Sequence, residues 1–226
     1  MNFVFVIVSI CILTVFIEAS DRATPSRLDY RKWNGLNVVS PVYDQGPIES
    51  CWTFATMGAL ESQALMAGFD YVKLSEQQLI SCVPTYRRPD SPVSGWDQQN
   101  AIRYLRARGA IADSDYPYRS NKTKRTERCK DADYDYVISC SKHESYNPDY
   151  NDGYGTVGNH VILLVGYGTK DGVDVWIIKN SYGTSWGYDG FGYLTREIGH
   201  DCGITQHIVA SPIIEGIYVQ YAVSKI

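Results

Sequence analysis

The chain reads Gln-Gly-Pro-Ile-Glu-Ser-Cys-Trp at residues 45–52, and a helix is expected to begin at the cysteine, Cys51. Apolar residues recur at three- and four-residue spacing from Cys51 to Ala67, and Gly68 follows in a C-cap-like position, so we predict a buried helix here. A cysteine in the first turn of a helix lies near unpaired amide groups and the positive end of the helix dipole, which stabilise its thiolate. The stretch therefore predicts a reactive thiol at Cys51.

Gln45 strengthens this interpretation. Its side-chain amide stands six residues before Cys51, where it can fold back and donate to an oxyanion alongside the Cys51 backbone amide. Taken alone, Cys51 would more often be a buried structural cysteine or one half of a disulfide. The neighbouring oxyanion donor favours a nucleophile instead.

Two later blocks supply partners for such a nucleophile. Residues 159–168 read Asn-His-Val-Ile-Leu-Leu-Val-Gly-Tyr-Gly, which puts His160 at the start of a buried strand, a rigid element suited to holding a base. Residues 176–187 read Trp-Ile-Ile-Lys-Asn-Ser-Tyr-Gly-Thr-Ser-Trp-Gly, in which Asn180 can orient the imidazole and aromatic rings can exclude water from that hydrogen bond. Alone, His160 would more often be structural.

The order of the expected elements indicates the fold class. Helices are expected first and short strands later, which implies an α+β chain with two lobes. Ser75 to Gln78 forms a capping box before a second helix, and a strand at Tyr136 to Ile138 is the one obvious candidate between residues 131 and 158. The other expected elements are a helix over Gln98–Arg108 and strands over Val161–Val165, Val175–Ile178 and Gly192–Thr195.

Length, composition and charge limit the domain organisation and the kinds of partner. The 226 residues, 44% of them hydrophobic, suit one large domain or two small lobes sharing a cleft. The formal net charge is only −4, and neither sign gathers into a face or tail, so nucleic acid is not an expected partner.

The first twenty residues are expected to be a signal peptide. An uncharged apolar run from Phe3 to Ile17 is followed by small or polar residues, where a signal peptidase can cut. The run is shorter than the roughly 20 apolar residues that span a bilayer, so a retained anchor is the weaker alternative. We therefore expect a protein of the secretory pathway, extracellular or in a lysosomal or digestive compartment, with no membrane contact after cleavage.

Cysteine counting predicts one free thiol. Cleavage would remove Cys11 and leave five cysteines, an odd number in an oxidising compartment. No two of them form a Cys-x-x-Cys clip and the chain has only four histidines, so neither a metal site nor a cofactor is expected. The five are Cys51, Cys82, Cys129, Cys140 and Cys202.

The three blocks, in this order, resemble the papain family of cysteine proteases over essentially the whole mature chain. The resemblance implies a helical N-terminal lobe over about 45–128, an antiparallel β-barrel-like C-terminal lobe over about 129–226, and an active-site cleft between them, within a peptidase domain at 21–226. It implies peptide hydrolysis by a monomer acting on peptide or protein substrates. Cys51 would be the nucleophile, His160 the base and general acid, Asn180 the orienting residue and Gln45 the oxyanion donor.

Within the family, the segment from Gly155 to Tyr193 most resembles the mite digestive proteases known as group-one allergens. Residues 136–140, Tyr-Val-Ile-Ser-Cys, point the same way. Residues 201–204, Asp-Cys-Gly-Ile, are similar to the cathepsin B branch, so the nearest branch is left open.

The resemblance assigns further residues. It pairs Cys82 with Cys129 in a disulfide, whereas a bond between Cys140 and Cys202 is only a guess. Asn121 begins the glycosylation acceptor Asn-Lys-Thr in a polar stretch expected to be exposed, with an unused acceptor as the alternative. The residues expected to line or cover the substrate site are Gly95, Trp96, Asn159, Trp186 and His207; Trp186 would shield the Asn–His contact and His207 would lie at the floor of a side-chain pocket.

Four departures from the family keep alternatives open. Ile48 and Glu49 replace the usual Cys-Gly before the nucleophile, which removes one familiar disulfide, and Trp96 falls at or near a glycine whose backbone pairs with substrate. The segment between Cys129 and His160 is much shorter than usual, which should leave strand edges unpaired or apolar surface exposed. No inhibitory propeptide is expected. An inactive relative acting as a binding or decoy protein, or a truncated gene product, is therefore the alternative to an active endopeptidase.

Overall fold

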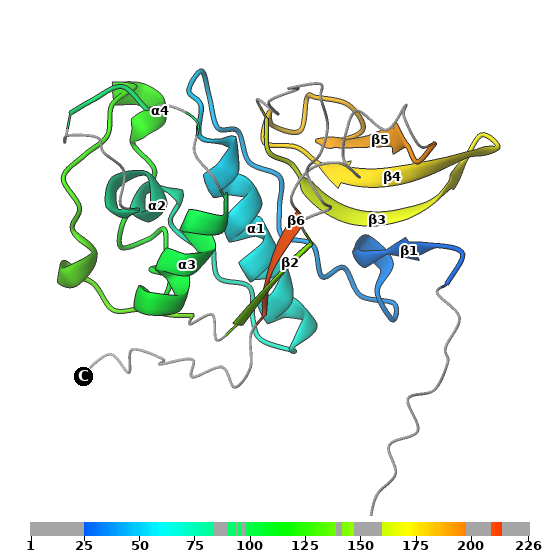
Figure 1. Ribbon diagram of the computed structural model, residues 1–226, viewed down its shortest axis with the longest axis horizontal. Helices are drawn as coiled ribbons and strands as arrows, with labels where there is room; N and C mark the ends of the chain where they lie inside the picture. The colour runs from blue at the N-terminus through cyan, green and yellow to red at the C-terminus, as the bar shows by residue number, and fades with distance from the viewer. Residues whose placement is uncertain are drawn as a thin grey trace, which may run out of the picture.

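The computed structural model describes residues 25–83, 90–93, 95, 98–138, 142–146, 160–197 and 209–213. Figure 1 shows a helical part and a sheet part side by side, with the first long helix lying between the other helices and the sheet. The predicted α+β arrangement is confirmed. The helices are α1 (Cys51–Met66), α2 (Glu76–Cys82), α3 (Gln98–Arg108) and α4 (Ser120–Thr123), with 3-10 turns η1 (Tyr30–Lys32) and η2 (Asp131–Asp133).

The helix ends follow the local sequence. Gly68, just beyond the end of α1, adopts a left-handed backbone conformation with φ +86°, which residues with a side chain rarely adopt. The Ser75 hydroxyl accepts a hydrogen bond from the Gln78 amide at 3.0 Å and caps α2. The reciprocal half of the capping box is replaced, because the Gln78 side chain donates to the Gly109 carbonyl and accepts from the Ile111 amide instead.

The main sheet is antiparallel with the strand order β1-β3-β4-β5. The strands are β1 (Leu28–Asp29), β3 (Leu163–Lys170), β4 (Val173–Lys179) and β5 (Phe191–Thr195). The segment before the first long helix supplies β1, which pairs with β3 at Leu28 and Tyr167. Gly166 is required at this edge, since a Cβ there would overlap the Leu28 carbonyl oxygen.

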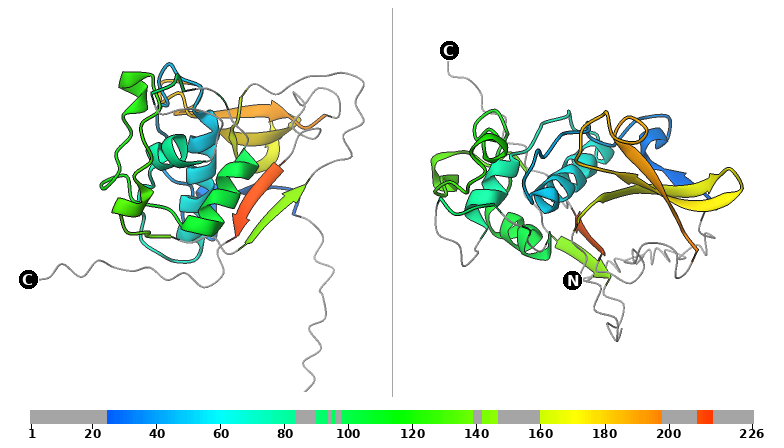
Figure 2. Two further views of the ribbon diagram at one scale, coloured as in Figure 1. Left: turned by 60° about the vertical axis from the view of Figure 1, so that its left-hand side comes forward. Right: turned by 90° about the horizontal axis from the view of Figure 1, so that it is seen from above.

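A second, two-stranded sheet pairs β2 (Lys142–Tyr146) with β6 (Val209–Ile213), and β6 lies against α1 and α3 (Figure 2). The strand predicted at Tyr136–Ile138 does not form. Ile138 instead makes an isolated antiparallel bridge with Ala110 and packs into the helical core. The expectation was wrong because the backbone partner of Ile138 lies in the helical part, not in a neighbouring strand.

Each part has its own apolar core. The helical core includes Trp52, Leu60, Leu79 and Ile102, and the sheet core is built on Val39, Val165 and Ile177. A disulfide between Cys82 and Cys129 ties the end of α2 to the segment before η2.

No helix in the described part of the chain is long and apolar enough to cross a membrane. The expected signal peptide lies outside the described residues. A cleaved signal peptide therefore stays a prediction, with a retained anchor as the weaker alternative.

Candidate active site

Cys51 is the first residue of α1 and is 5% exposed. It is a free thiol, as the odd cysteine count predicted for one cysteine of the chain. The backbone amide of Val161, on the segment that enters β3, lies 3.4 Å from the Cys51 sulfur and donates to it. The sulfur therefore lies where the helical and sheet parts meet.

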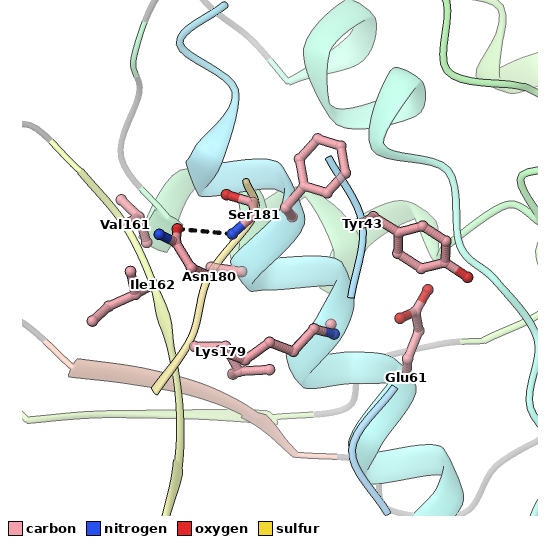
Figure 3. A pocket seen from close by; sticks show the side chains of 11 residues that line it. Tyr43, Glu61, Val161, Ile162, Lys179, Asn180 and Ser181 are labelled. Atoms are coloured by element: carbon pink, nitrogen blue, oxygen red, sulfur yellow. Dashed lines mark hydrogen bonds between the residues drawn. The ribbon is translucent and has the colours of Figure 1, made fainter. Parts of the chain in front are cut away.

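His160 and Asn180 meet beside this sulfur. The His160 Nε2 atom is 2.8 Å from Asn180 Oδ1, which leaves Nδ1 to serve the thiol. The Asn180 side chain is held in turn by the Ser181 amide, which donates to the same Oδ1 at 2.8 Å (Figure 3). Its backbone amide donates to the Gly190 carbonyl at 3.0 Å. Asn180 thus has little freedom to turn away from the ring.

The electrostatics of this pair favour charge separation. Burial acts to raise the pKa of the Cys51 thiol, but hydrogen bonds from His160 and from the Val161 and Trp52 amides outweigh it, so the pKa falls below its usual range. The hydrogen bond to Cys51, helped by the one to Asn180, raises the pKa of His160 above its usual value although burial opposes it. The two shifts together favour a thiolate next to an imidazolium.

Gln45 is buried and fixed by four hydrogen bonds, one of them from the Tyr118 hydroxyl to its carbonyl at 2.7 Å. Its Oε1 accepts from the Ser181 hydroxyl at 2.6 Å, its backbone amide donates to the Ser181 carbonyl at 2.8 Å, and its Nε2 donates to the Ile48 carbonyl at 2.6 Å. One Nε2–H remains for another acceptor. Sequence reasoning missed Ser181, which holds both Gln45 and Asn180; its place directly after Asn180 was the available signal.

Tyr182 provides the aromatic cover. Its ring stacks on that of His160 with a centroid distance of 4.9 Å and an interplanar angle of 27°, and its hydroxyl is 3.4 Å from Nδ1. Trp186, which is expected to shield the Asn–His contact, makes an edge-to-face contact with Tyr182 at 6.3 Å. Tyr182 is therefore the aromatic residue that lies directly on the imidazole.

A buried lysine lies beneath the site. Lys179, the last residue of β4, extends over α1 toward Glu61 and Tyr43 (Figure 3), and its ammonium donates to the carbonyl and hydroxyl oxygens of Ser40, both at 2.8 Å. Gly58 of α1 lies beside it, and a Cβ there would lie 3.3 Å from the Leu163 side chain and 3.4 Å from the Lys179 nitrogen. Burial lowers the pKa of Lys179 to about 8. A lysine ending an apolar strand was a signal that sequence reasoning did not use.

Ile48, which stands in the place of a family cysteine, is packed among apolar residues. Ile48 and Val93 lie in one small buried cluster together with Ile80, against which Tyr118 packs. Of the expected substrate-site residues, Gly95 is described, and its backbone amide donates to the Glu49 carboxylate at 2.7 Å. Trp96, Asn159 and His207 lie outside the described residues, as do Cys140 and Cys202.

Asn121 is less accessible than the sequence suggested. It is half-buried in α4, its side chain lies against Gly46, and its buried Oδ1 has no hydrogen-bond partner in the described part of the chain. A glycan at Asn121 stays a prediction, and it would require this side chain to move outward.

One group of closely spaced metal-ligand-type side chains occurs among the described residues: Cys82, Cys129 and Asp131. Its two sulfurs are bonded to each other in the disulfide, which leaves the carboxylate alone. The group is therefore not suited to hold a metal.

Comparison with known proteins gives concordant matches. The family model described as "Papain family cysteine protease" matches residues 24–154 and 146–212. A cathepsin L-like proteinase of Fasciola hepatica is 34% identical over 217 residues, covering 83% of this chain and 65% of the relative. Digestive cysteine proteinase 1 of Homarus americanus is 32% identical over 204 residues, covering 76% and 63%. The chain thus spans just under two thirds of the length of these relatives.

Comparison with solved structures gives matches of the same kind. Digestive procathepsin L 3 from the larval midgut of Tenebrio molitor matches with a TM-score of 0.68 and 29% identity, over 86% of this chain and 72% of that one. A structure from a study of the mite allergens Blo t 1 and Der p 1 also matches with a TM-score of 0.68, at 26% identity, over 88% and 74%. The mite proteins are thus one group of neighbours among several, and the chain belongs to the papain family of cysteine proteases.

Proposed function

We propose that this chain is a cysteine endopeptidase in which Cys51 is the nucleophile, His160 the base and general acid, and Asn180 the residue that orients His160. The observation that carries the proposal is the arrangement of the three groups at one point between α1 and the end of β4. There the thiol pKa is lowered and the imidazole pKa is raised. Such paired shifts suit a thiol that attacks a carbonyl near neutral pH.

The reaction would run in two halves. The Cys51 thiolate attacks the peptide carbonyl carbon, a C–S bond forms, and the oxyanion accepts hydrogen bonds from the Cys51 backbone amide and the remaining Gln45 Nε2–H. The C–N bond then breaks as His160 gives its proton to the leaving amine. Water next attacks the thioester, His160 takes its proton, and the Cys51 thiolate leaves with the regenerated imidazolium beside it.

The substrate class and the site of action are proposed by analogy with the relatives. We propose peptide and protein substrates, a monomeric enzyme, and action outside the cell or in a lysosomal or digestive compartment. The names of the matched proteins from Homarus americanus and Tenebrio molitor describe them as digestive. A particular kinship with the mite group-one proteases is a finer proposal, which rests on the sequence of residues 136–140 and of the segment around Asn180.

A non-catalytic binding protein on the same fold is the second candidate. One observation favours it: the Gln45 Nε2 atom already donates to the Ile48 carbonyl at 2.6 Å, within its own segment. If substrate does not draw this amide toward the oxyanion, the site would bind peptides without stabilising the transition state.

Covalent labelling separates the two candidates. An irreversible, substrate-like thiol reagent should modify the folded chain at Cys51 alone, and a fluorogenic peptide should be cleaved over mildly acidic to neutral pH. Cys51→Ala removes the nucleophile and should abolish both signals. Folded parent protein that neither reacts at Cys51 nor cleaves any peptide in a diverse library would rule the endopeptidase out.

A further inference from the structure

A carboxylate is fixed close to the nucleophile. Glu49 is exposed and precedes Cys51 by two residues, so their Cα atoms are at most about 7 Å apart, given the ~3.8 Å spacing of consecutive Cα atoms. Its Oε2 atom accepts the Gly95 backbone amide at 2.7 Å, a bond to a segment 46 residues away. The charge is therefore held at one place beside the site.

This carboxylate has no cationic partner within the described residues. The ion pairs there involve other acids: Asp29, Glu76, Asp90, Asp113, Asp131 and Asp171. One Glu49 oxygen carries the bond from Gly95, and the other has no hydrogen bond from a described residue. A charge-assisted bond from a bound cation is thus available at this point.

The two halves of a bound peptide must lie on opposite sides of Cys51. His160 must give a proton to the leaving amine, so the leaving half of the peptide lies toward the sheet part, where Tyr182 stacks on the imidazole. The acyl half, which becomes bonded to Cys51, must then extend the other way, toward the helical part. Glu49 and Gly95 lie on that side, because Gly95 belongs to the segment between α2 and α3.

We propose that Glu49 makes the site selective for peptides with a basic residue, arginine above lysine, at the position whose carbonyl Cys51 attacks. The proposal rests on the proposed endopeptidase activity and names its substrate class. A guanidinium suits a carboxylate better than an ammonium because it offers planar, paired N–H donors. The expected preference for the charged side chain is about tenfold, between the values typical of exposed and of hydrogen-bonded charge pairs.

The test compares two fluorogenic peptides that differ only at the cleaved residue, arginine in one and citrulline in the other. Citrulline keeps the shape of arginine and removes its charge, so the ratio of their kcat/KM values isolates the electrostatic contribution. The parent ratio should be about ten, and Glu49→Gln, which retains an oxygen for the Gly95 amide, should bring it close to one. Asp133→Asn removes an equal charge from an exposed residue of η2 and should leave the ratio unchanged.

A second measurement needs no variant. The parent ratio should fall as salt is raised to about 1 M, where the Debye length is only ~3 Å. A parent that cleaves both peptides with equal efficiency, or a ratio that survives Glu49→Gln, would overturn the role of Glu49 and leave the endopeptidase standing. A parent that cleaves neither peptide and resists thiol labelling would overturn both.

Discussion

At the scale of single residues, the pKa of the Cys51 thiol is lowered although burial opposes its ionisation. Burial alone would keep the thiol protonated, yet hydrogen bonds from His160 and from the Val161 amide reverse the balance. The two groups lie on the sheet side, whereas the end of α1 contributes its amides from the helical side. Thiolate formation therefore depends on both parts of the molecule being in place.

The pH dependence of kcat/KM should be bell-shaped. The acid limb should lie below the usual thiol range, where the Cys51 thiolate is protonated, and the alkaline limb above the usual imidazole range, where His160 loses its proton. Asn180→Ala removes one of the bonds that raise the pKa of His160, so the alkaline limb should move to lower pH and kcat should fall without being lost. Cys51→Ala and His160→Ala should abolish turnover. An Asn180→Ala profile that superimposes on the parent would contradict this role.

The residues that perform the proposed chemistry could be predicted, but several that position them could not. Cys51, His160 and Asn180 stand in local contexts that indicate a nucleophile, a base and an orienting amide, although His160 lies three residues before β3 and not at the start of the strand as expected. Ser181 and Tyr182 act through contacts with residues distant in the sequence, at Gln45 and His160. A hydroxyl or a phenol next to Asn180 does not reveal which of its neighbours it will contact.

At the scale of elements, the end of β4 is joined to α1 by Lys179. Its ammonium binds both oxygens of Ser40 and lies against Gly58, while the next residue, Asn180, holds His160. The electrostatic attraction of Glu61 acts to keep the Lys179 pKa from falling further. The strand that ends just before Asn180 is thereby held at a defined distance from the helix that carries Cys51.

Lys179→Met should loosen this connection. Both bonds to Ser40 disappear, so the His160–Asn180 pair should sit less accurately over Cys51, and a displacement of about 1 Å can cost on the order of 10²-fold in rate. We expect kcat to fall at least tenfold with little change in KM, because the peptide-binding surface is not altered. Lys170→Met, at the exposed end of β3, is the matched control. A stable Lys179→Met protein with parental kcat would refute the positioning role.

Local signals predicted α1, α2 and α3, but neither α4 nor the second sheet. Periodicity, Ser75 and Gly68 are local features that set the limits of α1 and α2. The β2–β6 pair joins Lys142–Tyr146 to Val209–Ile213, and β2 reads Lys-His-Glu-Ser-Tyr, without the β-branched character that marks a strand. Its pairing comes from a partner more than sixty residues away, which no local window contains.

At the scale of the whole molecule, a group of buried charges lies next to the site. Glu61 accepts the Leu74 amide at 2.8 Å, and Lys73 lies 3.3 Å from Glu76 and 3.0 Å from Asp113. Burial raises the pKa of both glutamates, that of Glu76 to about 8 despite the nearby Lys73. Ionising these carboxyl groups therefore works against folding.

This arrangement predicts a protein that is more stable in mild acid than at neutral pH. A carboxyl whose pKa is raised from about 4.3 in the unfolded chain to about 8 in the folded one binds its proton more tightly when folded. Its stabilising contribution is complete below the unfolded pKa and is lost as pH rises through the folded pKa. The free energy of unfolding should thus fall by roughly 2 kcal/mol between about pH 5 and pH 7.5. For a domain of this size, that corresponds to a decrease in Tm of about 5 °C.

Glu76→Gln tests the source of that slope. A glutamine cannot ionise but keeps an oxygen near Lys73, so from about pH 5 to pH 7.5 the variant should lose less stability than the parent, with Glu61 leaving a smaller slope of the same sign. Glu127→Gln, for which no comparable burial applies, should follow the parent curve. Asp29 does not mask the result, because its pKa is lowered and its carboxylate stays ionised across this range. A parent Tm that rises toward neutral pH, or a Glu76→Gln curve parallel to the parent, would show that Glu76 is ionised at little cost and that the acid preference has no basis in this buried group.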